Sequence, residues 1–133
     1  MQSNIARLCL IVVGILLVAS SLRAHHAFGA EFDANKPVKL RGTVSKVEWI
    51  NPHTWIHIDV KNADGTVSSW AIEAGTPNTM FRRGITKNSL VAGTELLITG
   101  FQEKAGRNRA NGQNITLPDG RSLFIGAGAP TAP

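Results

Sequence analysis

Cysteine and tyrosine are almost missing from this sequence of 133 residues, which has one cysteine and no tyrosine. The single cysteine excludes a disulfide-rich scaffold. Charged residues are also scarce, at 17%, whereas 43% of the residues are hydrophobic. That balance excludes a wholly disordered chain, and 13 glycines are too few for a collagen-like repeat. What remains is the composition and the length of one globular domain.

Common catalytic motifs are absent as well. No serine lies in a G-x-S-x-G elbow, and no glycine-rich stretch has the spacing of a phosphate-binding loop. The sequence has no H-E-x-x-H motif and no cluster of carboxylates that would strengthen a metal site. We therefore expect a protein that is not an enzyme, with copper-dependent oxidation as a remote alternative.

Residues 1–24 are typical of a secretory signal peptide. A basic start precedes an apolar run over residues 8–19, which is shorter than the roughly 20 residues of a transmembrane helix. We expect cleavage after Ala24, with cleavage after Ser21 or an uncleaved anchor as the alternatives. Cleavage would also remove the only cysteine, Cys9. The sequence thus predicts a periplasmic or secreted protein.

The expected mature chain, residues 25–133, carries 12 basic and 9 acidic residues, a net charge of +3. So mild a charge, in an exported protein, argues against a nucleic-acid partner. The partners we expect are a small ligand, a metal ion or another component of the cell envelope. We expect no stable membrane span after cleavage.

Alternating apolar residues predict β-strands in the first half of the mature chain. A long strand over residues 38–50 changes its apolar phase after Lys46, which indicates a β-bulge. Residues 54–61 alternate cleanly, turn through an Asp-Gly hairpin at 62–65, and return as a strand over 66–73.

The pattern changes to a helical one after these strands. Thr76 is a suitable N-cap and Pro77 a suitable first residue for a short helix over 78–83, which Gly84 ends. The remaining chain is predicted as a helical turn over 87–90, a strand over 94–102, a basic loop over 104–112 and a last hairpin over 114–125.

This order of elements predicts a mainly β fold. Three strands, a short helix and two or three further strands favour an OB-like, five- to six-stranded, partly open barrel with one short helix after strand three. A β-sandwich with a helical insertion is the alternative. The domains we expect are a signal peptide (1–24), an irregular segment (25–37), the barrel (38–125) and a disordered tail (126–133).

Several motifs of the chain resemble those of a known family. They are His-His-Ala-Phe at 25–28, Glu-Phe-Asp at 31–33, Gly-Thr-Val at 42–44, Val-Glu-Trp-Ile-Asn-Pro-His at 47–53 and Leu-Pro-Asp-Gly-Arg at 117–121. Together they resemble a family of small secreted proteins of Gram-negative bacteria that form a domain of unknown function. Ala27 stands where that family is expected to have serine. The resemblance implies secretion and a single β-rich domain, and it implies no activity.

The four histidines form two short clusters, His25 with His26 and His53 with His57. Cleavage after Ala24 would make His25 the first residue, whose amine and ring nitrogen could chelate one metal ion. That arrangement resembles the histidine brace of some copper proteins, and nitrogen ligands favour Cu(II) before Zn(II). His26, His53 and His57 are supporting candidates. The competing interpretation is that the first pair is idle and the second structural.

A second candidate site lies on the polar face of the predicted strand at 54–61. Trp55, His57 and Asp59 alternate with apolar Ile56 and Ile58, and Asp59 could orient the ring of His57. OB-like barrels bind ligands on this face. The ligand-binding candidates are Trp49, Trp55, Asp59, Trp70, Arg107 and Arg109. The competing interpretation buries all three tryptophans and leaves Arg82, Arg83 and the basic loop solvated.

Two functions follow as hypotheses. The first is a periplasmic, non-enzymatic binding module that binds Cu(II) or another divalent metal through His25. The alternative is an envelope module that binds a protein, peptide or glycan through the exposed tryptophan face and the basic loop, without metal.

Overall fold

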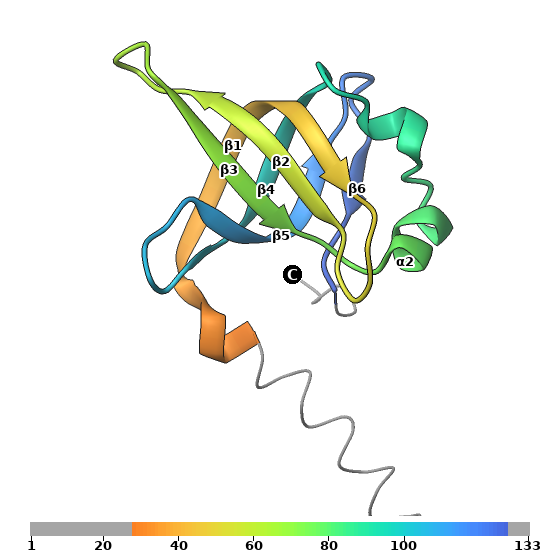
Figure 1. The fold of residues 1–133 in the computed structure, drawn as a ribbon, viewed down its shortest axis with the longest axis horizontal. Helices are drawn as coiled ribbons and strands as arrows, with labels where there is room; N and C mark the ends of the chain where they lie inside the picture. Colours follow the sequence, from red (N-terminus) through yellow and green to blue (C-terminus); the bar gives the residue numbers. More distant parts are fainter. Residues whose placement is uncertain (1–27, 128–133) are drawn as a thin grey trace, which may run out of the picture. The chain divides into compact units, whose positions relative to one another are not determined.

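The structure is a computed structural model that describes residues 28–127. The predicted signal peptide, His25, His26 and residues 128–133 of the predicted tail lie outside the described residues. A helical turn at 28–31 belongs to one compact unit, and all the strands belong to another that begins at Phe32. In chain order the elements of this second unit (Figure 1) are β1 (Phe32–Glu48), β2 (Trp55–Lys61), β3 (Val67–Glu73), α2 (Pro77–Arg82), the 3-10 helix η1 (Lys87–Leu90), β4 (Glu95–Glu103), β5 (Arg109–Thr116) and β6 (Ser122–Phe124).

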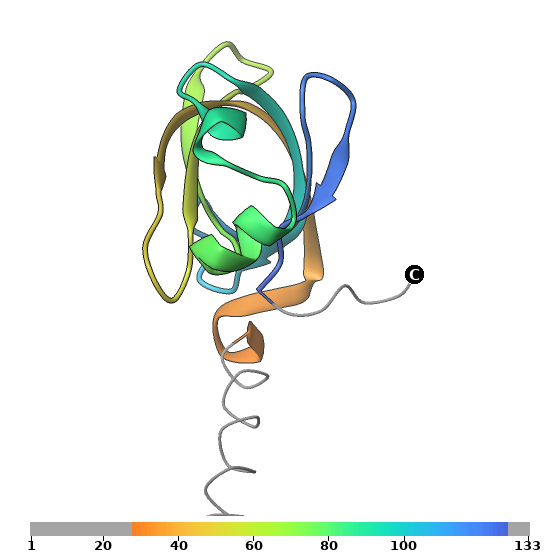
Figure 2. The ribbon, with the colours of Figure 1, turned by 90° about the vertical axis from the view of Figure 1, so that its right-hand side faces the viewer.

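The strands form one sheet that partly closes on itself. Within the described residues its order is β3-β2-β1-β4-β5-β6, and neighbouring strands are antiparallel. An additional parallel pairing joins Ala71–Glu73 of β3 to Arg109–Asn111 of β5. Figure 2 shows the curled sheet, with α2 and η1 lying across its nearer end. The predicted fold class, mainly β and partly open with a short helix after the third strand, is confirmed.

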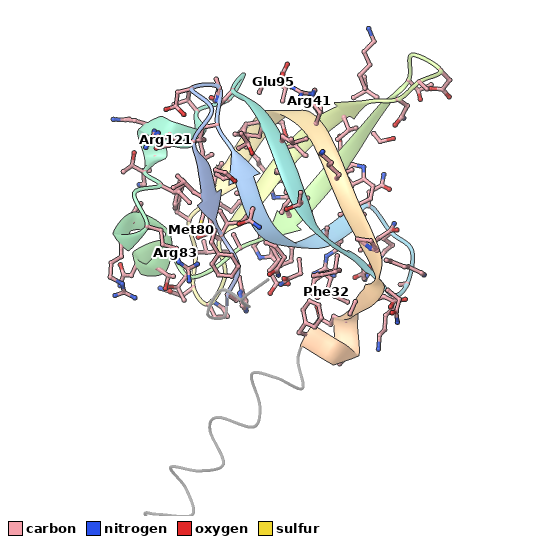
Figure 3. The ribbon with its side chains drawn as sticks, turned by 180° about the vertical axis from the view of Figure 1, so that it is seen from behind. Phe32, Arg41, Met80, Arg83, Glu95 and Arg121 are labelled. Atoms are coloured by element: carbon pink, nitrogen blue, oxygen red, sulfur yellow. The ribbon has the colours of Figure 1, made fainter. Side chains whose placement is uncertain are left out.

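The core lies inside the curl and follows from the alternation of each strand. Ile56 and Ile58 of β2 point inward and are fully buried, as are Ile72, Leu96, Ile98 and Ile115 of the other strands. Met80 of α2 adds a buried side chain that points toward the sheet (Figure 3). Each such aliphatic side chain contributes roughly 1.5–3 kcal/mol by leaving water. The helix therefore closes one end of the core.

The helix begins where the sequence predicts. The Thr76 hydroxyl accepts a hydrogen bond from the backbone N–H of Thr79 at 3.1 Å, and Pro77 occupies the first helical position. At the other end, Arg83 donates to the carbonyl of Gly126 at 2.7 Å and lies over the Phe124 ring at 4.7 Å. Arg83 thus links the end of α2 to the chain after β6. Of the predicted basic pair Arg82-Arg83, Arg83 therefore has a structural role.

β1 confirms one prediction and corrects another. Its pairing with β2 shifts register between Val44 and Lys46, as the change of apolar phase predicts. The strand begins at Phe32, however, whereas the sequence predicts an irregular segment up to residue 37. Residues 34–37 are exposed and residues 33–37 show no apolar alternation, yet Phe32 pairs with Glu103 before the register shifts at Pro37. Pairing with a distant strand decides the conformation here.

The predicted basic loop over 104–112 is also shorter than expected, because β5 already begins at Arg109. Ala110, Asn111 and Gly112 are buried between neighbouring strands. Gly112 faces Gly100 of β4, and a Cβ on Gly112 would lie 2.6 Å from Ile125 Cδ1. The Gly/Asn-rich composition, which is typical of a loop, instead serves a close approach of strands.

Candidate functional site

The outer face of β2 carries Trp55, His57 and Asp59, all partly exposed. We call the surface that they form with the neighbouring Glu48 and Arg109 the Trp55 face. Arg109 reaches it because β3 pairs with β5: Ala71 of β3 pairs with both His57 and Arg109. The Arg109 guanidinium carbon lies 4.9 Å from the centroid of the Trp55 ring. The closing of the sheet thus joins residues of β2 and β5 in one surface.

Arg109 is held in place by a buried carboxylate. Glu103, whose side chain is 4% exposed, accepts a hydrogen bond from Arg109 Nη1 at 2.7 Å. It also accepts two hydrogen bonds from Arg107, from Nε and Nη2, both at 2.6 Å. The two guanidinium groups, Arg107 above all, hold the pKa of Glu103 below its ordinary value. The carboxylate therefore stays ionised and fixes the guanidinium that lies on Trp55.

His57 is oriented by Glu48 of β1. Its Nε2 lies 2.7 Å from Oε2 of Glu48, and the other carboxylate oxygen, Oε1, accepts a hydrogen bond from Lys46 Nζ at 3.1 Å. The bond from His57, and next that from Lys46, lower the pKa of the Glu48 carboxyl. Since an ionised carboxylate only accepts, Nε2 of His57 is the donor in this pair.

The sequence indicates that Asp59 could orient His57, but in the structure Glu48 contacts the His57 ring and Asp59 has another partner. Asp59 accepts a hydrogen bond from the Ser69 hydroxyl at 2.7 Å. The reason is the bulge in β1, which turns Lys46 and Glu48 to the side where His57 lies.

His53 lies in the connection between β1 and β2. Its Nδ1 is 3.2 Å from the carbonyl oxygen of Ala74 and 3.2 Å from Oε1 of Glu73. A carbonyl oxygen can only accept, so Nδ1 is the donor. The Glu73 side chain is 11% exposed. His53 thus links the connection before β2 to the end of β3.

Trp49, Trp55 and Trp70 lie in three different environments. Trp70 pairs with Ile58 and packs against the core from the inner side of β3. Trp49 packs at the border of the core and stacks on Phe81 of α2, with ring centroids 5.1 Å apart. All three tryptophans lie in the described range, and only Trp55 belongs to the surface that it shares with His57 and Arg109. Alternation could have placed Trp70 inside, because it has the same parity as buried Ile72.

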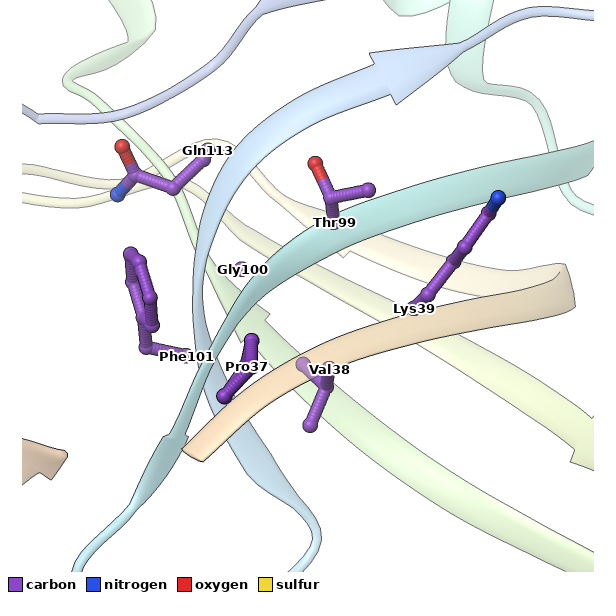
Figure 4. Close-up of a pocket in the computed structure, with 7 residues that line it drawn as sticks. All are labelled: Pro37, Val38, Lys39, Thr99, Gly100, Phe101 and Gln113. Carbon is purple, nitrogen blue, oxygen red and sulfur yellow. The ribbon is translucent and has the colours of Figure 1, made fainter. Parts of the chain in front are cut away.

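Metal-ligating side chains do not gather within residues 28–127, where no group of three His, Cys, Asp or Glu residues could hold an ion. His25 and His26, the first candidates, lie outside that range. A shallow hollow of about 400 Å³ lies on β1, β4 and β5 (Figure 4). None of the predicted site residues lines it; its lining is Pro37, Val38, Lys39, Thr99, Gly100, Phe101 and Gln113.

Comparison with known protein families assigns the chain to a family. Residues 13–113 match the sequence model of DUF6152, described as a family of unknown function. The chain belongs to DUF6152. The match includes the whole Trp55 face, from Glu48 to Arg109, and Glu103 behind it. No curated protein and no solved structure matches this DUF6152 chain. Within its described residues, no helix has the length and apolar character to cross a membrane.

Proposed function

We propose that this DUF6152 chain is a non-enzymatic, periplasmic binding module whose ligand contacts the Trp55 face. The observation that carries the proposal is the contact of Trp55 with Arg109, whose guanidinium is bound to the buried Glu103. An aromatic ring and a cation fixed in advance lose little freedom when a ligand binds. The predicted export signal at residues 1–24 supports the compartment.

The chemistry of the face favours a glycan. Trp55 offers an aromatic surface, while Arg109, the His57–Glu48 pair and the Asp59–Ser69 pair offer planar donors and acceptors around it. Hydroxyl-rich sugars match this combination of a stacking surface and hydrogen-bonding groups. Oligosaccharides also bind to OB-like barrels on strands two and three and on the loops beside them. Of the ligands expected from the sequence, a glycan therefore fits best.

The test is binding of the processed protein to an array of bacterial envelope oligosaccharides, followed by titration calorimetry with any oligosaccharide that binds. Trp55→Ala should lower the affinity about tenfold, a loss of roughly 1.4 kcal/mol. Lys61→Ala is the matched control, because Lys61 is exposed at the far end of the same strand. Binding that is unchanged in Trp55→Ala would refute the assignment of the face.

Binding of Cu(II) or another divalent metal is a second candidate function, favoured by the hydrogen bonds of the two described histidines. His53 and His57 each donate one ring N–H to a protein oxygen, which orients the ring. Metal-binding imidazoles are commonly supported in this way. The test is native mass spectrometry of the exported protein with and without one equivalent of copper. A chain that starts at His25 and retains copper, but loses it in His25→Ala, would support a metal site.

A further inference from the structure

The connection between β1 and β2 and the adjoining helix α2 expose apolar side chains. Ile50 is 53% exposed and Phe81 is 42% exposed. Phe81 stacks on Trp49, with ring centroids 5.1 Å apart and ring planes 21° apart. Figure 2 shows the connection beside α2 at the same end of the sheet. We call Trp49, Ile50 and Phe81 the aromatic edge.

Backbone hydrogen bonds tie the connection that carries Trp49 and Ile50 to the residues before α2. Thr54 donates to the carbonyl of Gly75 at 2.9 Å, and Ala74 donates to the carbonyl of Thr54 at 2.9 Å. Met80, the neighbour of Phe81, is fully buried and fixes the helix on the core. A group of exposed apolar residues of this kind marks an interaction site more often than a single one does.

Within residues 49–58 and 74–94 every charged side chain is basic, and Glu48 and Glu73, which directly precede these segments, lie against His57 and His53. Residues 74–94, which include α2 and η1, contain Arg82, Arg83 and Lys87 and no acidic residue. Residues 49–58 contain no acidic residue either. Arg82 directly follows Phe81 and is exposed, as is Lys87, whereas Arg83 is bound to the chain after β6. The surface thus combines apolar side chains with exposed positive charge.

We propose that the aromatic edge with Arg82 and Lys87 is a contact surface for an anionic lipid membrane. Tryptophan and phenylalanine favour the interface between lipid headgroups and acyl chains, and arginine and lysine are attracted by anionic headgroups. An acidic protein would satisfy the charges, but the protruding Ile50 and Phe81 fit a soft apolar layer without a matching pocket. The surface differs from the Trp55 face, since Trp49 packs against the core and Phe81 whereas Trp55 packs against Arg109.

The test is co-sedimentation of the processed protein with vesicles of phosphatidylcholine alone and with about one third phosphatidylglycerol. We expect binding to the anionic vesicles that weakens as salt is added, because salt screens the attraction. Phe81→Ser and Ile50→Ser should each lower the partition coefficient about fivefold, and Arg82→Ala should lower it by a similar factor on anionic vesicles only. Ile50 is 53% exposed, so Ile50→Ser is the variant to use if Phe81→Ser, which removes the ring that stacks on Trp49, disturbs the fold.

Val67→Ser is the matched apolar control, because Val67 is 63% exposed on β3, away from the aromatic edge. Lys61→Ala is the matched control for charge. Neither control should change the partition coefficient. The proposal is overturned if anionic vesicles do not bind the protein, or if Val67→Ser weakens binding as much as Ile50→Ser does. Loss of glycan binding in Trp55→Ala would leave this result unaffected.

Discussion

A methyl group added at Gly112 should loosen the place where the sheet closes. Gly112 of β5 faces Gly100 of β4, next to the residues that pair with β3. A Cβ there would lie 2.6 Å from Ile125 Cδ1, 2.8 Å from Ile72 Cγ2 and 3.2 Å from the carbonyl oxygen of Glu73. The first two distances are far shorter than an ordinary contact between carbon atoms. Gly112→Ala therefore requires the core or β3 to move.

The size of the effect follows from what surrounds the new methyl group. Ile72 and Ile125 are both fully buried, so neither side chain can turn into solvent, and the third neighbour is backbone. Overpacking of a closed core costs roughly 1–3 kcal/mol, and we expect about 2 kcal/mol for Gly112→Ala. For a domain of this size that corresponds to a decrease in Tm of roughly 8–16 °C.

Thermal unfolding followed by circular dichroism measures this decrease. Gly29→Ala is the control, because no heavy atom lies within 4 Å of a Cβ built there. Displacement of β3 from β5 should also separate Trp55 from Arg109, so tryptophan emission of the folded variant should change. A Gly112→Ala protein that unfolds at the same temperature as the unaltered protein would refute the reasoning, since the strands could then not be as close as described.

Two further changes test the helix and the buried carboxylate. Thr76→Ala removes the N-cap of α2 and should lower the free energy of unfolding, measured in urea, by about 1 kcal/mol. Asn78→Ala is the control, because Asn78 is exposed within the helix, and it should leave that free energy unchanged. Equal effects of the two variants would contradict the role of Thr76 as a cap. The pKa of Glu103 is lowered, so its ion pairs stabilise the fold above the ordinary value of 4.5 and lose that effect as the pH falls through the lowered pKa. Glu103→Gln should therefore be destabilised at about pH 7, and its deficit should shrink at about pH 3; a deficit that stays constant would contradict the ion-pair account.

The local features of the fold were predictable because neighbours in sequence determine them. The hairpin between β2 and β3, the cap of α2 and the bulge in β1 each follow from a short stretch of residues. The starts of β1 and β5 were not predictable, because polar or glycine-rich residues become strands there only by pairing with distant ones. No local signal identifies such pairing.

In the candidate site, too, some features follow from the local sequence and others depend on distant pairing. Alternation along β2 placed Trp55, His57 and Asp59 on one face, away from the core. The partners of these residues depend on non-local structure: Glu48 reaches His57 through the bulge, and Arg109 reaches Trp55 through the pairing of β3 with β5. The sequence spacing does contain one signal for the buried carboxylate: Glu103 lies four residues before Arg107, with which it forms an ion pair.

The parallel pairing of β3 with β5 has a thermodynamic consequence for whatever the Trp55 face binds. It consists of three residue pairs, against seven between β2 and β3. A short pairing opens more readily than a long one, and its backbone amides should exchange with deuterated water at a lower free energy than those of β2. A ligand that touches Trp55 and Arg109 together spans this junction and binds only when it is closed. Binding and closure are then linked equilibria, and the ligand stabilises the closed junction. The extent of this stabilisation can be measured as slower amide exchange at residues 71–73 and 109–111.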